Sequence, residues 1–104
     1  MCINEEISRT FEKIKHNIVA SVIKEIPSVE NIILYGSYGR DEGGWFYEND
    51  IIKPYNDFDL LLVVDKKFYP DKNFNKFRES LAQKIGIRWI DITFTSKVDL
   101  IKTK

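Results

Sequence analysis

The segment 57–65 constrains this chain most, because it opens a continuous apolar run with two aspartates that flank one phenylalanine. Side chains alternate between the two faces of a strand, so Asp57 and Asp59 are predicted to share one face while Phe58 points to the other. Neighbouring carboxylates on one strand repel each other, and a cation or a proton relieves that repulsion. We therefore expect a divalent-metal site at the start of this strand.

The size and charge of the chain set limits on its class. Its 104 residues fit one small domain, 1–104, with a single core. Hydrophobic residues make up 43% and charged residues 31%, a mix typical of a folded globular protein. Lys plus Arg number 16 and Asp plus Glu number 16, so no net charge draws a polyanion to the surface. This balance argues against bulk binding of nucleic acid.

The N-terminus and the cysteine content indicate the compartment. Cys2 is the single cysteine, which excludes an intramolecular disulfide and a cysteine-based zinc site. The first residues lack both the basic start and the apolar run of a secretory signal. No stretch approaches about 18 uninterrupted apolar residues, the length that spans a bilayer. We therefore expect a cytoplasmic protein with no membrane association.

Hydrophobic periodicity predicts an α/β order of elements. Apolar residues recur at steps of three and four over residues 4–26, which predicts a helix that Pro27 ends. Residues 29–35 predict a buried strand that runs into a tight turn at Gly36, with a short helix from about Ser37. The first half of the chain thus gives a helix followed by a strand.

The second half repeats strand, helix and strand. Residues 57–65 are the second strand, a helix is expected to start at Pro70-Asp71 and to end at Gly86, and residues 87–95 are the third strand. Because a helix joins the second and third strands, we expect them to be parallel neighbours. Residues 98–101 are expected to start another helix, and the sequence stops where we expect it to continue.

The spacer 41–56 is rich in turn formers and aromatic residues and shows no clear period. We interpret it as an inserted loop, or as a hairpin with arms 45–47 and 51–53. Trp45, Tyr47 and Tyr55 are candidates for a flap that stacks on a base or binds an acceptor. Packing of these rings over the sheet is the alternative interpretation.

A third acid lies inside the last predicted strand. Asp91 alternates with Ile90 and Ile92, so it can share the face used by Asp57 and Asp59. Mg²⁺ takes oxygen ligands in near-octahedral geometry and keeps part of its shell for water and phosphate. Two such ions about 3.5–4 Å apart hold the attacking and leaving oxygens of a displacement at phosphorus. We expect the three aspartates to hold two Mg²⁺ ions, with Mn²⁺ as an alternative.

The turn after the first strand is suited to phosphate. Gly36 lets the backbone approach a phosphate closely, and amides at the start of a helix favour an anion there. Ser37 adds a hydroxyl donor, and Arg40, one helical turn later, offers a fork of donors. Gly36, Ser37 and Arg40 are therefore our candidates for binding phosphates.

Together these pieces resemble the nucleotidyltransferase superfamily typified by DNA polymerase beta. The pattern of that superfamily is an apolar strand, Gly-Ser, a variable spacer, Asp-x-Asp in a strand, and a later aspartate in a strand. In this chain it reads Leu34-Tyr35-Gly36-Ser37-Tyr38-Gly39-Arg40, then Asn56-Asp57-Phe58-Asp59-Leu60-Leu61-Leu62-Val63, then Arg88-Trp89-Ile90-Asp91-Ile92. The resemblance covers most of residues 29–94.

The resemblance implies a fold and a reaction. The fold is an α/β nucleotidyltransferase fold, a small mixed sheet of three strands or more with helices packed on one face. The reaction is metal-dependent transfer of a nucleoside monophosphate, foremost AMP, from a nucleoside triphosphate to a hydroxyl of a protein, an RNA or a small molecule, with release of pyrophosphate. Nucleic acid enters only as one such acceptor.

The resemblance also implies roles for the candidate residues. In such enzymes the residues matching Asp57 and Asp59 bind both metals. The residue matching Asp91 binds the catalytic metal and helps to deprotonate the acceptor. Those matching the Gly36-Ser37 turn and Arg40 hold the β- and γ-phosphates.

In its short length, without room for a second domain, this sequence resembles the minimal nucleotidyltransferases of bacteria and archaea. These often pair with a separate helical protein (HEPN-like), including toxin–antitoxin pairs in which the transferase adenylylates its partner. The spacer between Ser37 and Asp57 is longer than in most minimal members, which leaves the acceptor open.

Other interpretations stay open at this point. One is a non-catalytic, antitoxin-like binding module of the same fold, and another is the catalytic domain of a longer transferase with a sugar-like or antibiotic acceptor. Individually, Asp57 is also consistent with a turn cap, Asp59 and Asp91 with solvent-facing strand residues, Gly36 with an ordinary turn and Arg40 with a surface charge.

Overall fold

The order of helices and strands agrees with the prediction from the sequence. The computed structural model describes residues 3–102, so Cys2 lies outside the described residues. Helix α1 (Ile3–Glu25) is followed by strand β1 (Asn31–Tyr35) and the short helix α2 (Gly36–Gly39). The remaining elements are β2 (Trp45–Glu48), β3 (Ile51–Pro54), β4 (Phe58–Val63), α3 (Phe74–Ile85), β5 (Ile90–Thr95) and α4 (Lys97–Lys102).

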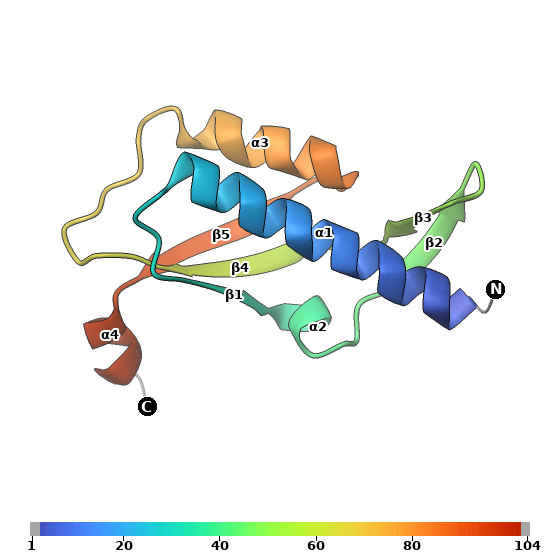
Figure 1. Ribbon diagram of the computed structural model, residues 1–104, viewed down its shortest axis with the longest axis horizontal. Helices are drawn as coiled ribbons and strands as arrows, with labels where there is room; N and C mark the ends of the chain where they lie inside the picture. The colour runs from blue at the N-terminus through green and yellow to red at the C-terminus, as the bar shows by residue number, and fades with distance from the viewer. Residues whose placement is uncertain (1–2, 103–104) are drawn as a thin grey trace.

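Strands β1, β4 and β5 form a mixed three-stranded sheet in the order β1-β4-β5 (Figure 1). Strand β1 is antiparallel to β4, and β4 is parallel to β5. The parallel pair was expected from the helical crossover between these strands and is confirmed. The chain therefore belongs to the α/β class with a small mixed sheet.

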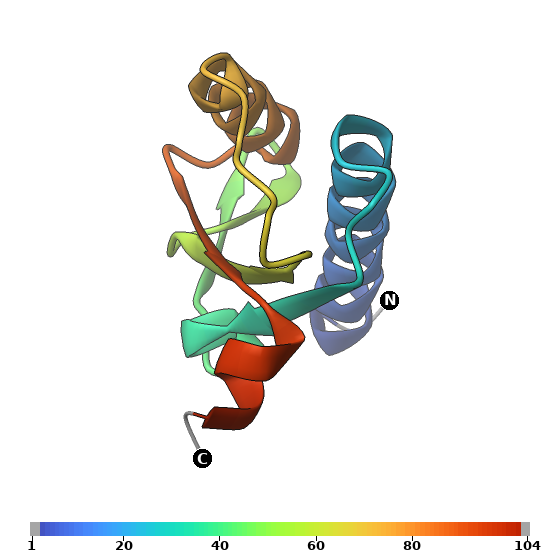
Figure 2. The same cartoon turned by 90° about the vertical axis from the view of Figure 1, so that its left-hand side faces the viewer.

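Helices α1 and α3 pack over one face of this sheet (Figures 1 and 2). The apolar stripe predicted over residues 4–26 is buried there, as are the inward side chains of α3 and β4. The members of this core are Ile14, Ile18, Val22, Ile26, Phe58, Leu60, Leu62, Phe74, Leu81, Ala82, Ile85 and Ile90, with Tyr38 and Val64. Because alternate residues of a strand point to opposite faces, the other face of β4 and β5 carries Asp59 and Asp91.

Helix α3 begins later than the sequence indicated. It starts at Phe74, not at Pro70-Asp71, because the backbone N–H of Phe74 donates to the Asp71 carbonyl and closes a turn first. The Asp71 side chain accepts from the N–H of Asn73 at 3.1 Å within the same turn. The end at Gly86 is confirmed, since this residue adopts the left-handed conformation with φ +92°.

The spacer folds as a hairpin, which is one of the two alternatives that the sequence left open. Strands β2 and β3 pair antiparallel around Asn49 and Asp50, whose φ angles are 53° and 64°. Positive φ at both central residues is the geometry of a tight two-residue hairpin turn, and Asn and Asp tolerate it best among residues other than glycine.

The helix expected near residues 98–101 is present as α4 (Figure 1). Its first turn is capped by Ser96, whose Oγ accepts from the N–H of Asp99 at 3.2 Å and donates to Asp99 Oδ2 at 3.0 Å. The helix follows β5 at the end of the sheet opposite to α2. Within residues 3–102, no helix has the length and apolar character needed to cross a membrane.

Phe58 joins three elements at the centre of the core. It is fully buried, its ring stacks on Tyr38 with centroids 4.3 Å apart, and it meets Phe11 of α1 edge-on at 6.2 Å. We predict that Phe58→Ala lowers the free energy of unfolding by about 3–5 kcal/mol, because it removes a large side chain and leaves a cavity. Urea unfolding measures this change.

Tyr69→Ala provides the control, because Tyr69 is 87% exposed. Its effect is expected to stay within about 0.5 kcal/mol. A loss smaller than about 1 kcal/mol for Phe58→Ala would contradict the central packing role of this ring.

Candidate active site

Asp59 and Asp91 lie side by side on neighbouring strands. They are direct partners in the parallel register of β4 and β5, and their strand neighbours Phe58 and Ile90 are fully buried on the opposite face. Adjacent strands are about 4.8 Å apart, so both carboxylates project from the same face within mutual reach. Of the predicted acids, these are the two that the sheet itself brings together.

The electrostatics of Asp59 reflect this crowding. Burial raises the pKa of Asp59 above its ordinary value of 3.8, and a hydrogen bond with Asp91 and the charges of Asp91 and Asp57 raise it further. The Arg40 charge opposes the rise. The protein therefore favours a proton or another cation at this pair.

Asp57 lies next to this pair but outside the strand. Strand β4 begins at Phe58, so the alternation that fixes the direction of Asp59 does not extend to the exposed Asp57. Within the part of the chain that the structure describes, no three His, Cys, Asp or Glu side chains form a ready metal-binding group. The three-aspartate metal site stays a prediction, and of its members Asp59 and Asp91 are register partners on neighbouring strands.

The glycine turn packs directly against this pair. Gly36 follows β1, has φ +71° and starts α2, and a Cβ at this position would overlap the Asp59 carboxylate. Only glycine meets both demands without strain. Ser37 follows in the same turn, and Gly36 is the member of the predicted phosphate-binding set that lies directly against Asp59.

Arg40 makes a contact that the sequence did not indicate. Its Nε lies 3.1 Å from Glu42 Oε2 in an ion pair whose side chains are 62% and 65% exposed. Its charge still acts on Asp59. An exposed pair of this kind contributes little to stability, so separating Arg40 from Glu42 costs little free energy.

Tyr38 was missed by reasoning from the sequence. Its hydroxyl donates to the Gly44 carbonyl at 2.6 Å and accepts from the N–H of Asn56 at 2.9 Å. Burial raises the pKa of Tyr38, so it stays a phenol and can donate. Tyr38 therefore ties the glycine turn to Gly44, just before β2, and to Asn56, which follows β3 and directly precedes Asp57. The sequence feature that corresponds to this contact is the Gly43-Gly44 pair. A Cβ on Gly43 would overlap the Tyr38 ring, so glycine is needed there.

The aromatic residues of the insertion divide between packing and exposure. Trp45 packs edge-on against Phe11 at 5.6 Å and Tyr38 at 5.5 Å, and Tyr47 donates to Glu6 Oε2 on α1 at 2.7 Å. The packing interpretation therefore holds for Trp45, whereas Tyr47 is 51% exposed and is held by this hydrogen bond. Tyr55 is 75% exposed and meets Phe46 edge-on at 6.1 Å.

Trp89, which directly precedes β5, forms a hydrogen bond with Asp91. The indole Nε1–H of Trp89 donates to Asp91 Oδ1 at 2.8 Å, and the Arg78 guanidinium lies 4.6 Å from the centre of the indole ring. The sequence carried no recognisable signal for this arrangement, since Arg78 comes from α3 and its neighbour is set by tertiary packing.

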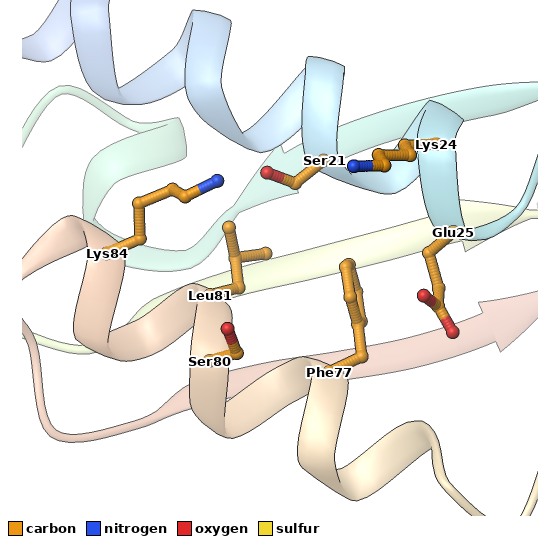
Figure 3. A pocket seen from close by; sticks show the side chains of 7 residues that line it. All are labelled: Ser21, Lys24, Glu25, Phe77, Ser80, Leu81 and Lys84. Atoms are coloured by element: carbon orange, nitrogen blue, oxygen red, sulfur yellow. The ribbon is translucent and has the colours of Figure 1, made fainter.

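A groove of about 300 Å³ lies elsewhere, between α1 and α3 (Figure 3). Its lining comprises Ser21, Lys24, Glu25, Phe77, Ser80, Leu81 and Lys84. These residues come from the helices that cover the sheet, whereas the aspartates project from the other face. The groove is thus separate from the candidate site.

Comparisons of the chain with protein-family models, with curated proteins and with solved structures find no match. The functional interpretation of the site therefore depends on the residues and geometry described above.

The raised pKa of Asp59 leads to a pH-dependent prediction for the metal-free protein. Asp59 keeps its proton to a higher pH in the folded protein than in the unfolded chain, so its charged form destabilises the fold. This penalty is absent below the ordinary pKa of 3.8 and grows as the pH rises through the folded value. Asp59→Asn should therefore raise the melting temperature by a few degrees at neutral pH and leave it unchanged near pH 3.

Thermal unfolding in the presence of a chelator measures this difference. Asp50→Asn is the matched control, because Asp50 sits at the exposed hairpin turn where Asn is equally suited. An Asp59→Asn protein that melts at or below the wild-type temperature at neutral pH would contradict the electrostatic account.

Proposed function

We propose that this protein is a metal-dependent nucleotidyltransferase that moves a nucleoside monophosphate, foremost AMP, from a nucleoside triphosphate to a hydroxyl acceptor and releases pyrophosphate. The observation that carries the proposal is the Asp59–Asp91 pair beside the Gly36-Ser37 turn. An acid pair next to a glycine-lined turn suits a metal-bound polyphosphate better than it suits a purely structural role.

The residues present fit Mg²⁺. Asp59 and Asp91 supply adjacent carboxylate oxygens, which are the ligands that Mg²⁺ prefers, and the exposed Asp57 can add a third. The raised pKa of Asp59 supports a site that takes up a cation. When bound, Mg²⁺ would neutralise the charge that develops on the phosphoryl oxygens.

The chain's own residues then divide the chemical work. Asp91 accepts the proton of the acceptor hydroxyl while that oxygen forms a bond to the α-phosphorus. The bond from the α-phosphorus to the oxygen that bridges to the β-phosphate breaks, and pyrophosphate leaves. The amides of the Gly36-Ser37 turn and the Arg40 guanidinium hold the departing phosphates.

Binding of the triphosphate should depend on the cation. The uncompensated charges of Asp57, Asp59 and Asp91 repel an anionic triphosphate, so ATP alone should bind poorly. We predict that ATP with Mg²⁺ raises the melting temperature of the wild-type protein, by an amount equivalent to about 2.7 kcal/mol at a hundredfold excess over the dissociation constant.

Asp59→Asn and Asp91→Asn should each abolish this stabilisation, and the Asp50→Asn control should retain it. Differential scanning fluorimetry with ATP, Mg²⁺, both or neither measures the effect. Equal stabilisation of all four proteins, or none for the wild type at saturating ligand, would contradict the proposed site.

Turnover is tested by pyrophosphate release and incorporation of labelled nucleotide, with the four triphosphates offered against lysate proteins, RNA and small hydroxyl compounds. The double variant Asp57→Asn, Asp59→Asn should lose at least about a hundredfold in rate, because charge stabilisation at the phosphoryl group is removed. If the double variant keeps full activity, the assignment is wrong.

A further inference from the structure

Asp91 differs from Asp59 in the support that its strand provides. Asp59 lies on the central strand β4, between Tyr35 of β1 and Asp91 of β5 in the register, and it contacts Gly36. Asp91 lies on β5, whose single neighbouring strand within residues 3–102 is β4. An exposed carboxylate on an edge strand keeps rotational freedom unless another group holds it.

Trp89 supplies that group. Its Nε1–H donates to Asp91 Oδ1 at 2.8 Å, a normal length for a hydrogen bond to a carboxylate. Indole nitrogen is a donor only, so Trp89 can neither take the acceptor proton nor ligate a metal. What it can do is fix one oxygen of Asp91 and leave Oδ2 available to Asp59 or to a cation.

Arg78 in turn holds the indole. Its guanidinium lies 4.6 Å from the centre of the Trp89 ring, and it also bonds to the Asn75 side chain on the same helix. Arg78 Nε is buried without a hydrogen-bond partner among the described residues. Two contacts therefore orient the Arg78 side chain, its stack on the indole and its hydrogen bond to Asn75, while Nε stays unpaired.

We propose that Trp89 is a positioning residue that orients the Asp91 carboxylate toward the cation site, with Arg78 of α3 fixing the indole. This inference rests on the proposed nucleotidyltransferase function. Residues that donate a hydrogen bond to a metal-ligating side chain, without binding the metal themselves, set the orientation of that side chain and the affinity of the site for the metal. Through the Arg78 stack, helix α3 thus contributes to the orientation of Asp91.

The test measures binding of Mn²⁺ alone to the full chain by electron paramagnetic resonance, which needs no acceptor or turnover. Trp89→Phe keeps an aromatic ring beneath Arg78 and removes the N–H. We expect its Mn²⁺ affinity to fall about tenfold, with unchanged circular dichroism. Tyr69→Phe, at an 87% exposed aromatic residue, is the control and should bind as the wild type does.

A second variant separates positioning from stability. Arg78→Leu removes the cation above the indole together with the buried, unpaired Nε, so the fold should not lose stability. Its Mn²⁺ affinity should still fall, by about threefold, since the indole loses its orienting contact. If Trp89→Phe does not fold, the Mn²⁺ affinity of Arg78→Leu tests the proposal on its own.

A spectroscopic signature completes the test. In a Trp45→Phe background Trp89 is the single indole, because the chain has 2 tryptophans. Mn²⁺ should quench its fluorescence over the same concentration range in which binding is seen. The inference would be overturned if Trp89→Phe and Arg78→Leu both bind Mn²⁺ with wild-type affinity, or if Trp89 fluorescence does not change when Mn²⁺ binds. Failure of the wild type to bind Mn²⁺ would instead overturn the proposed function beneath it.

Discussion

Two carboxylates at the same register of neighbouring parallel strands are the constraint on which the rest of this structure depends. Burial and mutual repulsion disfavour the doubly charged pair of Asp59 and Asp91, as the raised pKa of Asp59 reflects. The backbone is nevertheless built around them, since Gly36 has no side chain in the space that the Asp59 carboxylate needs. An uncompensated acid pair destabilises a fold, and a bound proton or cation would relieve that cost, which is the basis of the proposed metal site.

The surroundings hold the two acids by different means. Asp59 is held by the central strand, whose opposite face is anchored in the core through Phe58 and its stack on Tyr38. Tyr38 extends this support outward, because its hydroxyl joins the glycine turn to Gly44 and to Asn56. The residues that flank the inserted hairpin thereby help to fix the start of β4. Asp91, on the edge strand, is held by Trp89 instead.

Much of this arrangement follows from local sequence patterns. The alternation of β4 and β5 placed Asp59 and Asp91 on one face, and the helical crossover made their strands parallel, so their proximity could be predicted. Asp57 was assigned to the strand by the same rule, but the strand starts one residue later and the rule does not reach it. The roles of Tyr38 and Trp89 depend on contacts with the distant residues Asn56 and Arg78, which no periodicity encodes.

The proposed function requires that Asp59 and Asp91 share one cation. Its most direct test is a crystal structure with Mn²⁺ and a non-hydrolysable triphosphate, in which anomalous scattering locates the ion without reference to any assumed chemistry. We expect an anomalous peak about 2.0–2.2 Å from a carboxylate oxygen of each residue, with the triphosphate against the Gly36-Ser37 turn. An ordered triphosphate with no peak at this pair, or with the two carboxylates turned apart, would contradict it.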